Sequence, residues 1–202
     1  KMNMSIYEKY LVRDPAENNL IGAKNIDEMT YLSSEQVPES KNTVQINWIH
    51  GTPDPNPCIY EHSHNFDQVI INLGLDPELP QVLGGEIEFY LGGQQLKFNT
   101  SSSIYIPRGV KHGPVKWNSF YKPHLQIIVT IGSGSLKEIY DDSGIHDRKN
   151  VTPRKTEALD FEKYLIRSPI YENMPDVKNR QMPTMTYLSR THIPEISFYS
   201  EF

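Results

Sequence analysis

The central part of the chain alternates short strand-like runs with glycine and proline, and this pattern restricts the fold more than any other feature. Turn residues recur about every ten positions. The runs lie at 45–49, 69–73, 86–91, 95–98, 103–106 and 124–131. No stretch between them shows a long helical period, and the glycine pair 92–93 is placed like a hairpin turn. The pattern predicts an all-β sandwich or barrel.

The two ends of the chain are related to each other. The offset is 154 between residues 7 and 161 and 156 between residues 29 and 185, so the ends form one internal repeat of ~40 residues. The matching segments are 7–15 with 161–169, 29–33 with 185–189, and 37–39 with 193–195. Their apolar positions predict two arms that fold alike and dock on similar surfaces. A duplicated structural arm is the simpler interpretation; an arm that covers the mouth of a barrel is the functional alternative.

The repeat divides the chain into four parts. We predict an N-terminal arm at 1–45, a barrel at 46–135, a polar linker at 136–158 and a C-terminal arm at 159–202. Residues 136–140 inside the linker are predicted to form a helical turn. The second copy of the repeat stops where a second barrel would begin, which fits either a two-barrel ancestor that lost one barrel or a chain cut short.

The candidate chemistry lies in the segment from Tyr60 to Gln68. His62 and His64 are two residues apart, so in a strand their imidazoles point to one face, where both can reach a single ion. Gln68 lies four residues beyond His64 with the same parity. A proline-glycine turn precedes His112, which would come from a neighbouring strand. Three imidazoles and one amide from two separate strands can therefore converge inside a barrel.

These residues match a known pair of motifs. The pattern over residues 46–132 resembles the two conserved motifs of the cupin superfamily: His62-x-His64-x3-Gln68, then Gly85, then Pro107-x-Gly109-x2-His112. The resemblance implies a double-stranded β-helix, or jelly-roll, barrel with extended N- and C-terminal arms. It also implies one divalent metal ion, with His62, His64 and His112 as ligands and Gln68 at the position where many cupins have glutamate.

The sequence departs from the common cupin pattern at three places. Gln68 replaces the acidic ligand, the loop 76–80 lengthens the interval between the motifs, and Lys116 stands where an asparagine often follows the second motif. Gln68 is therefore either a fourth ligand or a residue that hydrogen-bonds within the barrel. Asp67 is the alternative fourth ligand, although its parity points outward.

Three further residues are candidates for substrate binding. Tyr60 shares the parity of His62 and would line the cavity or pack in the core. His124 and Gln126 begin an apolar strand and would face the pocket; a surface position, or a supporting position behind a ligand, is the alternative for His124. We identify no clear general base.

The predicted ligands are all neutral, so a bound divalent ion would keep nearly its whole charge. Such an ion is a strong Lewis acid that favours anionic substrates. Nitrogen-rich ligation suits Fe, Ni, Mn, Co or Zn. We therefore predict a metal-dependent enzyme of isomerase or lyase type that acts on a small polar or anionic molecule. An Fe-dependent dioxygenase and a non-catalytic ligand-binding or sensing cupin with a structural metal are the alternatives.

Composition excludes several other classes of protein. A formal net charge of −5 argues against a nucleic-acid partner, and no run has the ~18–20 apolar residues of a membrane span. Cys58 is the single cysteine, which excludes an intramolecular disulfide framework. The first residues form no apolar signal core, so we expect a cytoplasmic protein. The barrel edges and apolar arms predict a homodimer in which an arm extends a neighbour's sheet.

Overall fold

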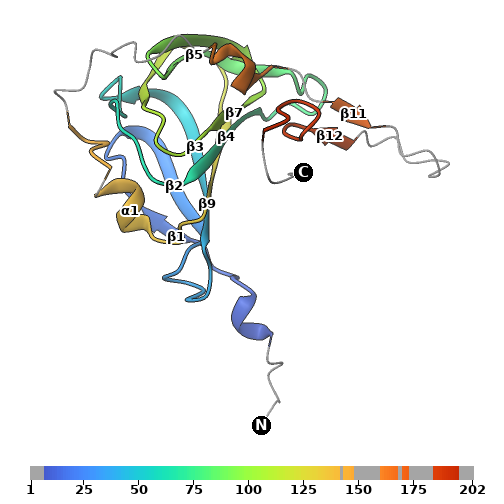
Figure 1. Ribbon diagram of the computed structural model, residues 1–202. Helices are drawn as coiled ribbons and strands as arrows, with labels where there is room; N and C mark the ends of the chain where they lie inside the picture. The colour runs from blue at the N-terminus through green and yellow to red at the C-terminus, as the bar shows by residue number, and fades with distance from the viewer. Residues whose placement is uncertain (1–6, 142, 148–159, 168–169, 173–183, 196–202) are drawn as a thin grey trace.

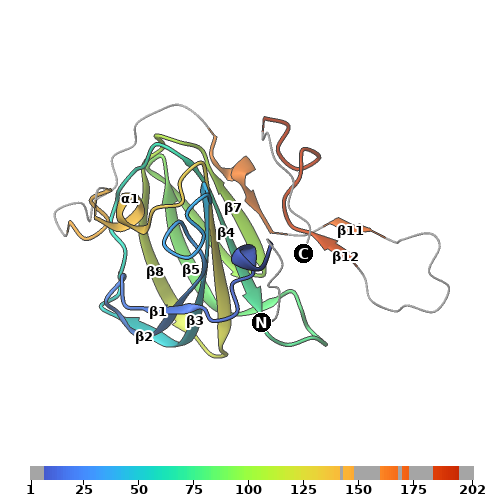
Figure 2. The same cartoon turned by 90° about the horizontal axis from the view of Figure 1, so that it is seen from below.

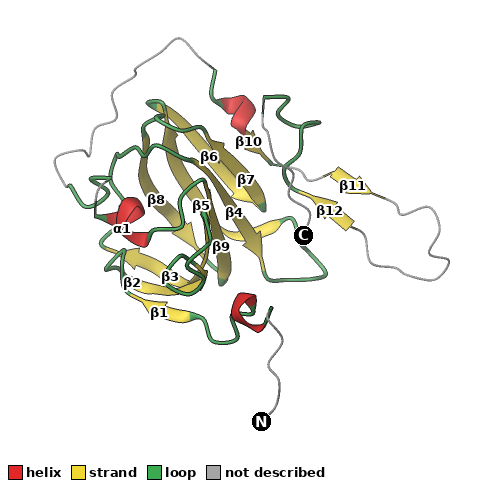
Figure 3. Cartoon of the chain, turned by 60° about the horizontal axis from the view of Figure 1, so that its bottom comes forward, coloured by secondary structure: helices red, strands yellow, loops and turns green. Residues whose placement is uncertain are grey.

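The computed structural model describes residues 7–141, 143–147, 160–167, 170–172 and 184–195. This part of the chain consists almost entirely of strands and loops (Figures 1 and 3), with one short helix, α1 (Leu136–Tyr140), and two 3-10 turns, η1 (Glu8–Tyr10) and η2 (Glu162–Tyr164). None of the described helices has the length and apolar character needed to cross a membrane.

A large antiparallel sheet forms one wall of the barrel. Its order is β1-β2-β3-β9-β4-β7-β10. The strands are β1 (Ala16–Asn18), β2 (Lys24–Leu32), β3 (Asn42–Asp54), β9 (His124–Ile131), β4 (Asp67–Gly74), β7 (Ser102–Ile106) and β10 (Leu165–Ile166). The first two strands belong to the N-terminal copy of the repeat, so this arm extends the barrel's own sheet.

A smaller sheet closes the barrel opposite the large one. Its order is β6-β5-β8, with β6 (Gln94–Thr100), β5 (Val82–Leu91) and β8 (His112–Phe120). After β4 in the large sheet, the chain crosses to the small sheet for the hairpin β5–β6 and returns to the large sheet for β7. It then crosses to the small sheet for β8 and back to the large sheet for β9. This alternation between two antiparallel sheets is the jelly-roll arrangement. The all-β jelly-roll prediction is therefore confirmed.

One apolar core fills the space between the two sheets. Ile70, Ile104 and Ile128 of the large sheet pack in the same cluster as Phe89 and Val115 of the small one. The turn 92–93 has positive φ angles of 57° and 79°, which suit glycine in a tight hairpin. Gly92 also approaches the ring of Phe161 so closely that a Cβ would lie 2.1 Å from it.

The two copies of the repeat fold alike where both are described. Each copy has a 3-10 turn with nearly the same dihedral angles at its ends. Lys9 pairs with Glu39 in one copy as Lys163 pairs with Glu195 in the other. The strand pairs also share a register: Ala16 lies opposite Thr30 in β1–β2, and the equivalent residues 170 and 186 lie opposite each other in β11 (Ile170–Glu172) and β12 (Thr184–Thr186). The prediction of two similar arms is confirmed over these residues.

The arms differ in where they pack. The C-terminal copy lies beside the β4–β7 side of the barrel (Figure 2), and its β10 pairs with β7. The N-terminal turn η1 lies apart from that side (Figure 3). Accordingly Leu165 is 6% exposed and its counterpart Leu11 is 55% exposed. The described parts of the two arms therefore pack on different surfaces of the barrel, and the prediction that they dock on similar ones is wrong within this chain.

Candidate metal centre

Three histidine side chains converge at one point inside the barrel. His112 begins β8, and its backbone exchanges two hydrogen bonds of 2.9 Å with the backbone of His62. His64 follows in the segment that leads into β4. One nitrogen of each ring lies within 4.8 Å of those of the other two, and all three residues are buried. The three side chains therefore come together as predicted, although the strand expected at His62 and His64 is absent and His62 forms only an isolated bridge with His112.

The second nitrogen of each ring is held by a backbone carbonyl. His62 Nδ1 lies 2.8 Å from the Tyr60 oxygen, His64 Nδ1 lies 3.2 Å from the Phe66 oxygen, and His112 Nδ1 lies 3.0 Å from the Val110 oxygen. A carbonyl accepts only, so each Nδ1 carries the proton and each Nε2 presents a lone pair. This is how metal-ligating histidines are usually oriented.

The Nε2 atoms of His64 and His112 are buried and have no hydrogen-bond partner. An unsatisfied buried nitrogen is costly, and a divalent ion at the convergence point would satisfy both. Stacking fixes the ring planes further, because the His64 ring lies 4.0 Å from the Phe66 ring at an angle of 6°. The residues present therefore fit a metal ion with His62, His64 and His112 as ligands.

Burial keeps the three imidazoles neutral. It lowers the pKa of His62 to about 4, lowers the pKa of His64, and lowers the pKa of His112 well below its ordinary value. The neighbouring histidines lower the pKa values of His62 and His112 further, since a second proton would add a like charge. Neutral rings at pH 7 are the form that binds a metal.

Acidification is expected to destabilise the metal-free chain. An unfolded histidine binds a proton near its ordinary pKa of 6.5, whereas folded His62 does so only near 4. Between these values the unfolded state holds more protons, so the free energy of unfolding falls as the pH drops, by up to about 1.4 kcal/mol per pH unit for each such histidine. Urea unfolding in EDTA at about pH 7 and about pH 5.5 measures this loss. His62→Gln should lose less, and equal stability of the unmodified chain at both pH values would contradict the prediction.

Gln68 and Asp67 diverge at the start of β4. Gln68 is buried and lines the same small cavity as His62 and His112. The Asp67 carboxylate instead accepts the backbone N–H of Arg108 at 2.9 Å and lies 3.6 Å from the Arg108 guanidinium. Asp67 therefore holds the turn before His112, and the alternative that made it the fourth ligand is wrong.

The cavity beside the histidines is small and mostly apolar. Its volume is about 20 Å³, which is room for about one water molecule. Helix α1 and the following loop close it with Ile139, Tyr140 and Ile145. The Tyr140 hydroxyl donates to the Gln45 side chain at 3.1 Å. Sequence reasoning placed these residues in a polar linker and missed them, although the apolar spacing within 136–145 was a signal that the segment packs.

The three predicted substrate-binding residues have different positions. Gln126 lines the cavity, and its amide is hydrogen-bonded to Asn47 and Asn72. His124 is buried, but Trp117 donates its indole N–H to His124 Nε2 at 3.0 Å, and His124 lies outside the lining of the cavity. Tyr60 is also absent from the lining and contributes the carbonyl that holds His62. Of the three, the structure brings only Gln126 to the metal centre.

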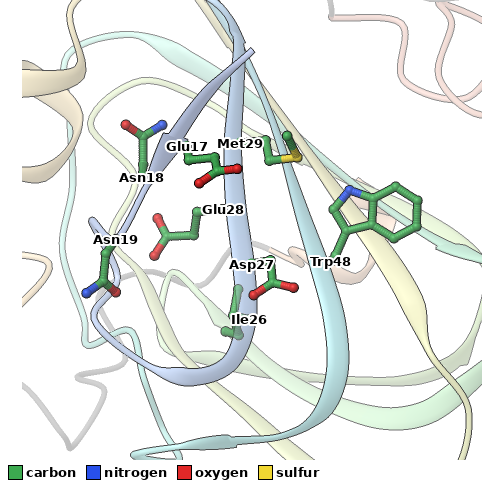
Figure 4. Close-up of a pocket in the computed structure, with 8 residues that line it drawn as sticks. All are labelled: Glu17, Asn18, Asn19, Ile26, Asp27, Glu28, Met29 and Trp48. Carbon is green, nitrogen blue, oxygen red and sulfur yellow. The ribbon is translucent and has the colours of Figure 1, made fainter. Parts of the chain in front are cut away.

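A second, open pocket of about 560 Å³ lies over β1, β2 and β3 (Figure 4). Glu17, Asp27 and Glu28 make it acidic. The Glu28 carboxylate is buried and already accepts the backbone N–H groups of Leu20 and Ile21, and burial raises its pKa. Its bonds shape the β1–β2 connection, so this carboxylate serves the fold.

Comparisons with known proteins find distant structural similarity and no match by sequence. No protein-family model matches the sequence, and no curated protein matches it. Among solved structures, an RmlC-like cupin from Shewanella frigidimarina matches at 13% identity over 69% of this chain and 96% of its own, with a TM-score of 0.39. The polyketide cyclase RemF from Streptomyces resistomycificus matches at 12% identity over 75% of this chain and 99% of its own, with a TM-score of 0.40.

A protein from Thermotoga maritima described as a predicted oxalate decarboxylase matches at 15% identity over 60% of this chain and 98% of its own, with a TM-score of 0.41. Similarity at this level carries no argument, and the jelly-roll fold is assigned from this chain's own strand order.

Proposed function

We propose that the barrel binds one divalent metal ion through the Nε2 atoms of His62, His64 and His112, with the Gln68 amide oxygen as a fourth ligand. The observation that supports this most directly is the convergence of three buried nitrogens whose rings are oriented by backbone carbonyls. Fe, Ni, Mn, Co and Zn all accept nitrogen-rich ligation.

The neutral ligands support a role for the ion as a Lewis acid, which would polarise an oxygen of a bound small molecule. Among the described residues no lysine or arginine lines the cavity, so the ion's charge would be the attraction for an anionic group. Gln126 lines the cavity beside the histidines and can orient a substrate. We therefore propose a metal-dependent enzyme of isomerase or lyase type acting on a small polar or anionic molecule, and α1 must move for such a molecule to enter.

The closed cavity favours a second candidate function. Space of about 20 Å³ holds a water molecule and excludes a sugar acid or oxoacid. A non-catalytic cupin with a structural metal needs no more room than this. The two candidates differ in whether a small carboxylate can reach the ion.

Metal removal is the experiment that tests the proposal. Full-length protein purified without chelator or nickel resin is expected to contain one divalent ion per chain by elemental analysis. Dialysis against EDTA should lower the melting temperature, because an ion that binds only the folded state stabilises it by mass action. Re-addition of each of the five metals should restore it. Protein with no stoichiometric metal, and no response to any of the five, would overturn the proposal.

Water relaxation measured on the Mn-loaded protein then separates the two candidates. Displacement of a bound water by small carboxylates would support the enzyme, and an ion inaccessible to both water and carboxylates would support the structural metal.

A further inference from the structure

The turn 107–110 decides how His112 is presented to the metal centre. Its Val110 carbonyl accepts a hydrogen bond from His112 Nδ1 at 3.0 Å. Because this bond sets the plane of the ring, the direction of the His112 Nε2 atom follows the position of the turn. The Asp67 carboxylate anchors the turn to the start of β4, since it accepts the backbone N–H of Arg108 at 2.9 Å and lies 3.6 Å from the Arg108 guanidinium.

Strand β7 holds Asp67 from the other side. Val69 lies opposite Tyr105 in the β4–β7 ladder, and both pack in the outer cluster of the large sheet, so Asp67 shares this face two residues before Val69. Burial, and then the negative charge of Asp67, raise the pKa of Tyr105 to about 12. The Tyr105 hydroxyl therefore keeps its proton and donates a hydrogen bond to the Asp67 carboxylate. The Asp67 side chain is only 13% exposed, so water competes little for its bonds.

The C-terminal arm packs behind Tyr105. Its strand β10 pairs with β7 (Figure 3), and the ring of Tyr164 lies 5.7 Å from the Tyr105 ring at an angle of 63°. The equivalent residue of the N-terminal copy is Tyr10, which is 49% exposed. A continuous series of contacts therefore runs from the C-terminal arm through Tyr105 and Asp67 to the turn that presents His112.

We propose that Asp67 is a positioning residue of the metal centre, and that the C-terminal arm supports it through Tyr105. The inference rests on the proposed metal-binding function and assigns a task to the second copy of the repeat. Asp67 coordinates nothing in this scheme. It fixes the turn 107–110, so that His112 is in place before an ion arrives. Hydrogen bonds behind a metal ligand are typically worth ~10–100-fold in metal affinity.

A second hydrogen bond to the turn defines the alternative. The Gly109 backbone N–H donates to the His64 carbonyl at 2.8 Å, and this bond does not involve Asp67. A single bond would leave the turn able to pivot about it, whereas the additional bond from Arg108 to Asp67 fixes its orientation. If the Gly109 bond were enough, replacing Asp67 would leave His112 unchanged.

Nitrogen-15 NMR of the histidine rings in the full chain with EDTA tests the positioning without a metal. In the unmodified chain His112 should hold its proton on Nδ1 alone, because the Val110 carbonyl accepts it. Asp67→Ala should give His112 a mixture of the two neutral tautomers, and Asp67→Asn should restore the single one, since an amide oxygen still accepts the Arg108 N–H. A chain that binds no metal would overturn the proposed function, whereas the tautomers judge this inference in either case.

Titration with Co²⁺ measures the consequence for the metal centre. Asp67→Ala should weaken Co²⁺ binding at least ~10-fold and alter the visible absorption of the bound ion, which reports the arrangement of its ligands. Tyr164→Ala should weaken binding ~3-fold, as expected for a residue that acts at a distance. In combination with Asp67→Ala it should add nothing further, because both residues act through the same turn.

Two matched controls separate positioning from stability. Asp76 likewise accepts a backbone N–H of its own turn, from Glu78 at 3.1 Å, and pairs with a lysine, but this turn lies beyond the opposite end of β4. Asp76→Ala and Tyr10→Ala should leave the tautomer, the Co²⁺ affinity and the spectrum unchanged. The inference is overturned if Asp67→Ala affects these readouts no more than Asp76→Ala does, if Asp67→Asn loses as much as Asp67→Ala, or if Tyr164→Ala matches Tyr10→Ala.

Discussion

Replacing His64 by alanine is expected to remove stoichiometric metal from the protein while the barrel stays folded. The His64 Nε2 is buried and without a hydrogen-bond partner, and Nδ1 of the same ring donates to the Phe66 carbonyl at 3.2 Å, so loss of the ring costs the fold this one bond. Loss of a hydrogen-bonding partner behind a metal ligand costs ~10–100-fold in metal affinity, and loss of the ligand itself should exceed ~100-fold. Elemental analysis and calorimetric titration with the metal found in the unmodified protein measure this effect.

The matched control is His50→Ala. His50 is an exposed histidine on β3 whose Nε2 lies 3.5 Å from an Asp27 oxygen, and it should keep both the metal content and the affinity of the unmodified chain. Circular dichroism and thermal melting in EDTA should show both variants folded. His64→Ala with one tightly bound ion per chain would show that the proposed ligand set is wrong.

The variant Gln68→Glu tests whether residue 68 is the fourth ligand of the metal ion. If Gln68 lies in the coordination sphere, a carboxylate there should tighten binding of divalent metal and reduce the net charge of the centre. Unchanged affinity in this variant, together with loss in His64→Ala, would place Gln68 among the hydrogen-bonding residues of the barrel and leave three histidines as the protein ligands.

Much of the fold was predictable because the barrel repeats a local pattern. Each of the six predicted runs lies within a strand, and 124–131 coincides with β9. A strand at His112 was expected, but the extent of β8 was not, because Gly113 and Pro114 in its first residues carry turn signals although β8 is an edge strand of its sheet. The N-terminal arm was predicted to dock on a surface as a unit of its own, whereas β2 pairs with β3 along most of its length and so belongs to the barrel's sheet. Such pairing depends on long-range register, which local patterns do not contain.

The metal centre was more predictable than the pocket around it. The convergence of His62, His64 and His112 was expected from their spacing and one turn, although His62 forms only an isolated bridge and His64 lies in no named strand. Which side chains close the cavity depends on how the segment after β9 folds back over the barrel, and Tyr140 reaches Gln45 across 95 residues of sequence. His124 shows the same limit, since its partner Trp117 lies in the part of β8 beyond His112 that was not predicted.

Gly113→Ala is expected to be the most destabilising conservative change near the metal centre. Gly113 follows His112 directly and has a φ angle of 84°, which side chains with a Cβ rarely adopt. A Cβ at this position would also lie 2.6 Å from the Tyr60 carbonyl oxygen, the acceptor that orients His62. The backbone must shift to relieve this contact. We expect a loss of at least ~3 kcal/mol in the free energy of unfolding, measured with urea, and weaker metal binding.

Gly109→Ala separates the effect of the contact with the Tyr60 carbonyl from the effect of the positive φ angle. Gly109 lies in the same motif with a similar φ angle of 76°, but no atom lies within 4 Å of the position its Cβ would take. This variant should lose only the ~1–2 kcal/mol that a left-handed conformation costs a residue with a side chain, and it should keep its metal. Because the two glycines share their conformation and differ in what surrounds them, the difference between the variants measures the close approach of His112's strand to the Tyr60 carbonyl. Equal losses in the two variants would mean that this approach does not hold the metal centre together.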